Sequence, residues 1–389
     1  MKKQSENEVI RAWRSISISF ILNGIAIGSF VSRIPDFKRD LHVSNSAFGF
    51  SLFFVSLGVM SALRPAGKLC AKYGSASITL ISGLGIALSL LPFGKISGYE
   101  FFCLTLFIYG FLNASQDIAM NTHAVALESL SGRRMMVTFH GMWSVGALIG
   151  GGLSALFIRL HTVLNEQYLL VATLIVLLVL YTRNGFLPNS TDQSSTLKKS
   201  RSKTPKIILA LGCLGLCASL GEGASADWGG ILAKETIGAS SFIATLPYIF
   251  FMTGMILGRF SGDKLAERFG IRKILTISGA VFGSALLIGL VIGSVISEIV
   301  AWLFVGLGVA AVIPIIVSTT GSMVLKEYKD LISPSEAVAT VTAINYSGFF
   351  FGPPLMGFLA DQFTLRWAML LPALLGFALM AGSRAIIEN

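Results

Sequence analysis

Residues 67–74 read Gly-Lys-Leu-Cys-Ala-Lys-Tyr-Gly, and residues 263–273 read Asp-Lys-Leu-Ala-Glu-Arg-Phe-Gly-Ile-Arg-Lys. In both stretches a basic residue stands three positions after a leucine, and a glycine follows two positions later. The second copy lies 196 residues after the first, and Gly110 and Gly306 are separated by the same 196 residues. A repeat on this scale predicts a chain built from two equivalent halves.

Apolar stretches long enough to cross a membrane surround these two motifs. The chain has 389 residues, 53% hydrophobic and only 13% charged, and its mean hydropathy is +0.74. A soluble domain carries about 25% charged residues, and a membrane helix needs about 20 apolar ones. In lipid every backbone polar group must be paired within its segment, so spans of this length are helices. The sequence predicts an all-α membrane protein with twelve transmembrane helices, at residues 13–32, 45–63, 76–94, 100–126, 135–158, 166–186, 206–232, 240–261, 273–294, 297–324, 335–360 and 365–387.

The net charge of +10 is distributed as in a membrane protein, not as in a nucleic-acid-binding one. When both termini are placed in the cytoplasm, 23 of the 30 lysines and arginines fall on the inner side of the spans and 7 on the outer side. This excess obeys the positive-inside rule. We therefore expect a multi-pass protein of the inner (cytoplasmic) membrane, with both termini cytoplasmic and with lipids, not nucleic acid, as partners of the basic residues.

The middle of the chain is polar. Residues 188–206 are rich in serine and basic residues, which is typical of a flexible cytoplasmic linker. Six predicted spans precede this segment and six follow it. The sequence thus predicts an N-terminal six-helix bundle over residues 1–187, a linker over 188–206, and a C-terminal six-helix bundle over 207–389. Parallel repeats of this kind are typical of transporters that work by alternating access.

The repeated motif resembles the hallmark of the major facilitator superfamily, G-x-L-x-D-R/K-x-G-x-R/K-R/K. The second copy has the matching acidic residue at Glu267, but Asp263 stands where the first glycine belongs. The first copy has Ala71 at the acidic position, which departs from the usual charge contact of the first half. The resemblance implies the major facilitator fold, in which two pseudo-symmetric six-helix bundles enclose a cavity lined by helices 1, 4, 7 and 10.

Further motifs resemble the MosC/YbjJ-like branch, which is related to the fucose permeases. The stretches that carry this resemblance are Ser32-Arg33-Ile34-Pro35 and residues 117–128, 139–146 and 222–228. The resemblance covers the whole chain. It implies a solute transporter and says little about which solute is moved.

Polar residues follow one face of the fourth predicted span. Asn113, Asp117 and Asn121 are spaced four residues apart, and Gln116 lies beside them. A single buried amide is more often a packing contact between helices. Because several polar groups, one of them ionisable, share this face, we interpret it as a wall of the substrate cavity. The other candidates for this cavity are Asn23, Trp143, Glu222 and Asn345. Trp143 would either stack on a ring of the solute or serve in packing.

Ionisable residues within the spans are candidates for proton coupling. A charged group in hydrocarbon costs about 2.5–3.5 kcal/mol or more, so it usually lines a water-filled path or has a partner. Glu222, between Gly221 and Gly223, and Asp117 are the main candidates, with His140 as a possible relay. The alternatives are a permanently paired carboxylate and a hydrogen-bonded structural histidine.

Two opposite charges end the first and seventh spans. Arg33 lies at the outer end of the first span and Asp227 at the outer end of the seventh. We interpret them as an outer gate pair, and the alternative for Arg33 is a bidentate contact with an anionic substrate.

No feature of the sequence indicates an enzyme. It has no catalytic His/Asp motif, no metal-ligand spacing and no Walker loop, and its four cysteines show neither a disulfide nor a zinc pattern. We expect no cofactor and no metal. The predicted function is secondary active transport of a small polar organic solute, sugar- or cyclitol-like, by a monomer, with proton symport. The alternatives are a proton-coupled exporter of a small metabolite and a non-transporting sensor on the same fold.

Overall fold

The computed structural model describes residues 6–133, 135–187, 204–328 and 331–385. These residues form helices and connecting turns and contain no strand. Most of the predicted linker, residues 188–203, lies outside the described part of the chain. The helices group into two compact units. One unit comprises residues 1–42 and 51–196, and the other comprises residues 43–50 and 197–389.

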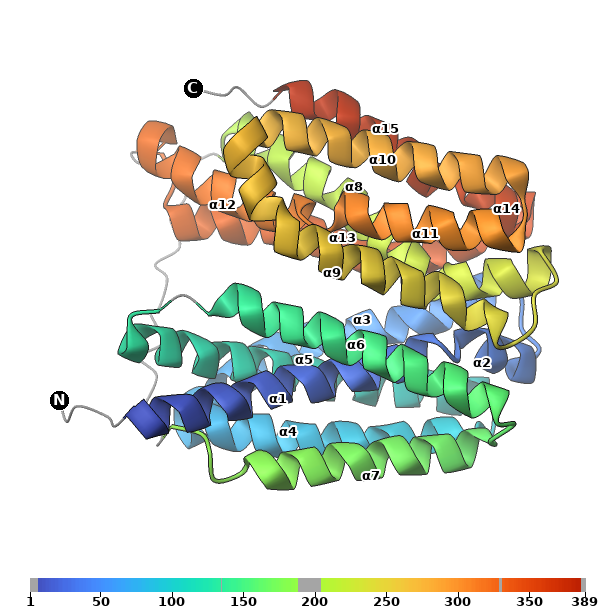
Figure 1. Cartoon of the computed structure of the whole chain (residues 1–389), viewed down its shortest axis with the longest axis horizontal. Helices are drawn as coiled ribbons and strands as arrows, with labels where there is room; N and C mark the ends of the chain where they lie inside the picture. The colour runs from blue at the N-terminus through green and yellow to red at the C-terminus, as the bar shows by residue number, and fades with distance from the viewer. Residues whose placement is uncertain (1–5, 134, 188–203, 329–330, 386–389) are drawn as a thin grey trace. The chain divides into compact units, whose positions relative to one another are not determined.

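The first unit is built from seven of the described helices. Helix α1 packs on α6, and α4 packs on α5 and α7 (Figure 1). The helices are α1 (Glu6–Val31), α2 (Ile34–Leu41), α3 (Asn45–Tyr73, from residue 51 onward), α4 (Ser75–Leu90), α5 (Tyr99–Ser131), α6 (Met136–Arg159) and α7 (Leu164–Thr182).

The second unit repeats this packing. Helix α8 packs on α13, and α10 packs on α11 and α15, as their counterparts do in the first unit. The helices are α8 (Lys206–Ile231), α9 (Leu246–Phe269), α10 (Ile271–Ile292), α11 (Val295–Val309), α12 (Val312–Met323), α13 (Pro334–Phe363), α14 (Leu365–Ala368) and α15 (Leu370–Gly382). Short one-turn helices adjoin them at Leu91–Gly94, Leu232–Thr236, Ile243–Thr245, Val324–Tyr328 and Ser383–Ala385.

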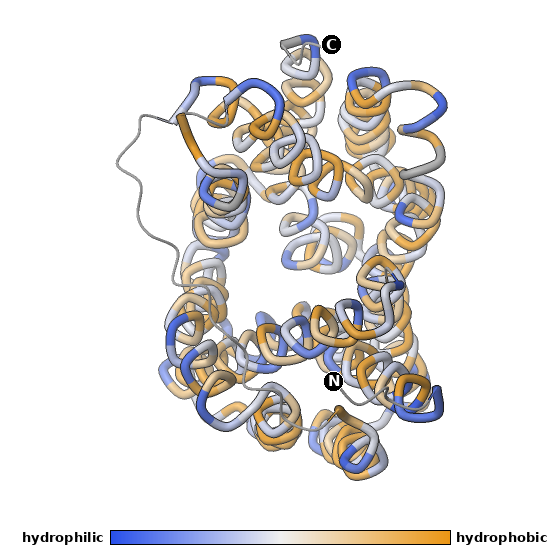
Figure 2. The backbone as a smooth tube through the Cα atoms, turned by 90° about the vertical axis from the view of Figure 1, so that its left-hand side faces the viewer, coloured by the Kyte–Doolittle hydropathy of each residue, from blue (hydrophilic) through white to orange (hydrophobic). Residues whose placement is uncertain are grey.

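The predicted spans correspond to these helices. Eleven helical stretches of the described chain are long and apolar enough to cross a membrane. The one remaining predicted span, residues 335–360, is covered by the 30-residue helix α13. Hydrophobic residues dominate the helices in Figure 2. Helix α2 was not predicted, because its eight residues include both acidic and basic side chains.

One predicted span is broken. Residues 297–324 were expected to form a single helix, but α11 ends at Val309 and α12 begins at Val312. Pro314 explains the break, because its ring clashes with the carbonyl of the residue four positions earlier, Ala310. Proline is tolerated in the first turn of the new helix, where backbone N–H groups have no partner within the helix.

Close helix contacts repeat at the same offset as the sequence motif. In the first unit a side chain at Gly110 would clash with the carbonyl oxygen of Val55, and in the second a side chain at Gly306 would clash with that of Phe251. Each pair of equivalent residues is 196 positions apart. Only glycine allows such an approach of two helix backbones. The repeat is therefore a repeat of three-dimensional packing.

The two copies of the motif end in the same backbone turn. Gly74 precedes α4 with φ 85° and ψ 145°, and Gly270 precedes α10 with φ 82° and ψ 148°. This conformation is open to glycine and strained for other residues. The conserved backbone geometry explains why each copy of the motif has glycine at this position.

The first turns of α3 belong to the second unit. The backbone N–H groups of Asn45 and Ser46 donate to the carboxylate of Asp361, at the end of α13 (3.0 and 2.8 Å). A side chain at Gly49 would clash with the carbonyl oxygen of Pro353. A carboxylate at a helix N-terminus satisfies free N–H groups and interacts favourably with the helix dipole.

Candidate functional site

Helix α5 carries the polar stripe that the sequence predicted. Asn113, Asp117 and Asn121 are all half-buried, on a helix that otherwise buries mainly apolar side chains. The amide nitrogen of Asn121 donates to Asp117 Oδ1 (3.0 Å) and to the Asp117 backbone carbonyl (2.8 Å). The amide nitrogen of Asn113 has no hydrogen-bond partner among the described residues. The stripe therefore keeps hydrogen-bonding capacity that the described chain does not use.

Four helices of the first unit are joined by a chain of hydrogen bonds next to this stripe. Trp143 Nε1 on α6 donates to Asn23 Oδ1 on α1 (2.9 Å), and Asn23 Nδ2 donates to Gln116 Oε1 on α5 (3.0 Å). Gln116 Nε2 in turn donates to the backbone carbonyl of Thr79 on α4 (3.4 Å). Asn23 is 1% exposed and Gln116 0%, whereas Trp143 is half-buried. The structure thus brings three predicted cavity residues together.

The two ionisable site candidates of the second unit, Glu222 and Asp227, both lie on α8. Glu222 is half-buried on α8, and it interacts electrostatically with Arg259 and Tyr248, both on α9. Arg259 lies inside the membrane-length stretch Ile243–Gly262. The sequence does not predict this positive charge beside Glu222, because Arg259 lies at the cytoplasmic end of the predicted span 240–261. Asp227 is half-buried one to two turns further along α8.

Arg33 is buried and fully engaged within its own unit. Its Nη1 donates to Asp36 Oδ2 on α2 (2.8 Å), and Nε donates to Gln167 Oε1 on α7 (2.8 Å). Gln167 Nε2 in turn donates a hydrogen bond to Ser154 Oγ (2.8 Å). Both side chains of the Arg33–Asp36 ion pair are 7% exposed. The expected partner Asp227 belongs to the other unit, so the gate pair stays a prediction.

The remaining candidates have local contacts. Asn345 is 3% exposed on α13, and its amide nitrogen donates to the Gly212 carbonyl on α8 (3.1 Å). His140 is exposed in the second turn of α6 and makes an edge contact with Phe20. His123 on α5 is 3% exposed, and its Nδ1 forms a hydrogen bond with Ser75 Oγ (2.9 Å). The cavity role of Asn345 and the relay role of His140 stay predictions.

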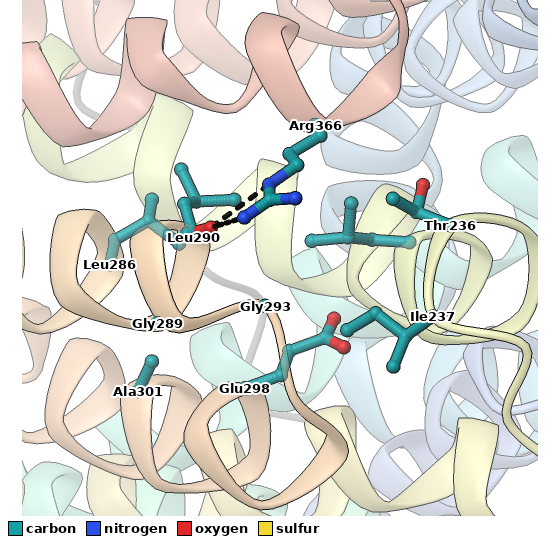
Figure 3. Close-up of a pocket in the computed structure, with 10 residues that line it drawn as sticks. Thr236, Ile237, Leu286, Gly289, Leu290, Gly293, Glu298, Ala301 and Arg366 are labelled. Atoms are coloured by element: carbon teal, nitrogen blue, oxygen red, sulfur yellow. Dashed lines mark hydrogen bonds between the residues drawn. The ribbon is translucent and has the colours of Figure 1, made fainter.

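A small cavity of about 30 Å³ lies in the second unit, away from all of these residues. Figure 3 shows Arg366 and Glu298 facing it from opposite sides. Arg366 Nε donates to the Leu290 carbonyl at the end of α10 (2.9 Å), and Glu298 lies in the first turn of α11. Each charge complements a helix dipole, so we interpret both as structural. Glu298 was not predicted as a candidate, although it is an acidic residue inside the predicted span 297–324.

The described groups of histidine, cysteine and acidic side chains include no cluster that could hold a metal ion. Two repeated units of membrane-length helices, with polar and ionisable side chains within them, define a membrane transport protein. The sequence profile of the Major Facilitator Superfamily matches residues 16–222 and 211–386. The chain therefore belongs to the Major Facilitator Superfamily, as the motif predicted.

Relatives and solved structures agree with this assignment. The chain is 29% identical over 368 residues to the uncharacterized transporter y4wD of Sinorhizobium fredii, covering 92% of this chain and 93% of that protein. It is 27% identical over 357 residues to the membrane protein MosC of Rhizobium meliloti, covering 92% and 85%. The predicted resemblance to the MosC-like branch is confirmed.

Two solved transporters share the fold. The nucleoside transporter NupG has a TM-score of 0.69 at 16% identity, over 97% of this chain and 99% of that one. A bacterial homologue of the human lysosomal transporter Spinster, in an inward-facing and unoccupied conformation, has a TM-score of 0.70 at 12% identity, over 98% and 97%. These similarities establish the predicted all-α major facilitator fold.

Proposed function

We propose that the chain is a proton-coupled symporter that moves a small polar organic solute, sugar- or cyclitol-like, across the cytoplasmic membrane by alternating access. Membership of the superfamily supports transport of a small molecule. The solute class rests on one observation, the half-buried stripe of Asn113, Asp117 and Asn121 on α5. Carboxylate and amide groups of this kind bind hydroxyl groups through hydrogen bonds.

Uptake into proteoliposomes tests the proposal. Purified protein is reconstituted and given labelled sugars, polyols, cyclitols, nucleosides and amino acids, with and without an inward proton gradient. Nucleosides belong in the panel because NupG, a fold neighbour, transports them. The proposal expects accumulation of a hydroxyl-rich solute only with the gradient. Accumulation of amino acids alone contradicts the solute class.

Coupling is assigned to Asp117 or Glu222, because each is an acidic group half-buried within a membrane-length helix. A carboxylate that gains and loses a proton during the cycle links the solute to the proton gradient. Glu222→Gln and Asp117→Asn are each expected to abolish proton-driven accumulation, and at least one of them keeps solute exchange without a gradient. Normal accumulation by both variants contradicts the assignment.

The uptake experiment also tests the alternative of export. Solute accumulation driven by a proton gradient of the opposite direction would favour export of a small metabolite.

The outer gate is proposed to involve Arg33 and Asp227. Opposite charges at these helix ends attract when the outer side closes, so their interaction favours one state of the cycle. Distances between spin labels at the outer ends of α1 and α8 are expected to lengthen in Arg33→Ala and Asp227→Ala. Unchanged distances in both variants leave Arg33 with the structural contacts to Asp36 and Gln167 described above. A protein that shows no uptake in proteoliposomes but is stabilised against heat by a solute would be a sensor.

A further inference from the structure

The hydrogen-bond chain from Trp143 to Thr79 has a fixed direction. An indole nitrogen can only donate and a backbone carbonyl can only accept. All three hydrogen bonds form only if the amide oxygens of Asn23 and Gln116 face Trp143 and their amide nitrogens face Thr79. The structure shows this arrangement. Neither amide can rotate by half a turn without breaking two bonds.

Glycines next to the hydrogen-bonded residues allow the helices to pack closely around them. A side chain at Gly24 would clash with the backbone carbonyl of Trp143, so α1 and α6 touch beside Asn23. A Cβ at Gly83 would lie 2.7 Å from Gln116 Nε2, so α4 leaves room for the donating amide. Close-packed interiors transmit small displacements of this kind.

Burial decides which of these residues a solute can reach. Asn23 and Gln116 are almost completely buried, and their bonds run to each other and to the two ends of the chain. Trp143 is half-buried, and its N–H is already used. One part of its ring packs against the apolar cluster that includes Phe20 and Phe139, so only the exposed part of the ring remains for a ligand.

We infer that Asn23 and Gln116 are positioning residues that hold the indole of Trp143, and that the solute contacts in the first unit are made by the Trp143 ring and by Asp117 and Asn121. The inference rests on the proposed function and narrows the solute to one that carries both a ring face and hydroxyl groups. Apolar C–H groups of such a ring pack on the indole, while hydroxyl groups donate to the carboxylate.

The first part of the test measures the environment of Trp143 directly and does not depend on transport. The full-length protein is labelled with 5-fluorotryptophan, which gives five ¹⁹F signals for its five tryptophans, and Trp143→Phe assigns one of them. Gly83→Ala pushes on the Gln116 amide and is expected to shift the Trp143 signal, as is Gln116→Met. Gly85→Ala is the matched control, because its Cβ would lie 2.7 Å from a methyl group of Leu112 on the same pair of helices.

The same variants are then compared in solute exchange. If Gln116 positions Trp143, Gly83→Ala raises KM about tenfold and leaves the maximal rate, while Gly85→Ala changes neither. A Trp143 signal that is unmoved in Gly83→Ala and Gln116→Met overturns the positioning role, whether or not any solute is transported. A moved signal with unchanged KM overturns the ring contact only. Gly83→Ala keeps the test valid if Gln116→Met does not fold.

Discussion

Helix α5 and the broken pair α11–α12 occupy equivalent places in the two units, and they differ in both chemistry and continuity. Helix α5 is one unbroken helix of 33 residues with the polar stripe around Asp117. The equivalent of Asp117 in the second unit is Ile313, beside the break before Pro314. The backbone contacts at Gly110 and Gly306 are nevertheless the same.

The comparison shows that the repeat conserves packing and leaves the polar chemistry free to differ. In the second unit the position equivalent to Asp117 is apolar, and the interacting charges lie on α8 and α9, at Glu222 and Arg259. Contacts between helix backbones depend on small residues at fixed positions, whereas a polar group needs only a partner within reach. Structural symmetry and functional asymmetry can therefore coexist in one chain.

The largest expected effect is loss of accumulation in Asp117→Asn, with the internal solute concentration no higher than the external one. Ile313→Asn places the same amide at the equivalent position and is the control. If only α5 carries this chemistry, Ile313→Asn keeps accumulation in proteoliposomes. Loss in both variants, with unchanged melting temperatures, would mean that the two helices are functionally alike.

Gly110→Ala and Gly306→Ala break the contacts that the two units share. Each new methyl group meets a backbone carbonyl that cannot move alone, and overpacking of this kind costs about 2–3 kcal/mol. We expect similar losses of thermal stability for both variants. Gly152→Ala is the control, because a Cβ at Gly152 would meet no atom within 4 Å. A large loss of thermal stability at only one of the two glycines would show that the two contacts are not energetically equivalent.

The charges of the second unit are tested as a pair. Arg259→Gln leaves Glu222 without its positive neighbour and is expected to cost about 1–2 kcal/mol, less than for a fully buried pair. The double variant Glu222→Gln/Arg259→Gln is expected to recover much of this loss in melting experiments. Strictly additive effects of the two substitutions would exclude a direct interaction.

The smallest expected effect concerns the start of α3, whose equivalent in the second half of the chain is the one-turn helix Ile243–Thr245 that leads into α9. Ser44 Oγ accepts the backbone N–H of Ala47 (3.2 Å), and the equivalent Ser240 Oγ accepts that of Ile243 (3.3 Å). The start of α3 also has a carboxylate acceptor, Asp361, and among the described residues no such acceptor is recorded at the backbone of Ile243. Asp361→Asn is expected to cost about 0.5–1 kcal/mol at neutral pH, because it removes a charged cap.

The pH dependence of that effect is defined by the pKa of Asp361. Partial burial alone would raise the pKa, but hydrogen bonds, above all those from Ser46, lower it from 3.8 to about 2. A lowered pKa means that the stabilisation is present above pH 3.8 and is lost as the pH falls toward 2. The difference in melting temperature between wild type and Asp361→Asn should therefore be the same at pH 7.5 and pH 5. A difference that disappears by pH 5 contradicts the cap.

The sequence predicted the fold well because membrane helices are defined by local composition. Each span, and the polar stripe on α5, follows from residues within one helix. The repeat follows from comparing two short stretches of sequence. Partners across helices were not predictable in the same way. The chain through Asn23, Gln116 and Trp143 and the contacts of Arg33 with Gln167 depend on which helices touch and at what height. Arg259 was overlooked for a local reason, since a helix end cannot be located to within one turn from hydropathy alone.

The carboxylate of Asp361, which caps the N-terminus of α3, is synthesised long after α3 itself. The backbone N–H of Asn45 and its acceptor Asp361 are 316 residues apart, so α3 leaves the ribosome long before its cap exists. Chains are made from the N-terminus, and early segments ordinarily fold first. Here the beginning of an early helix is completed by one of the last segments to be made. A half-length product would carry an unfinished helix start, which cellular quality control could use to distinguish it from the complete chain.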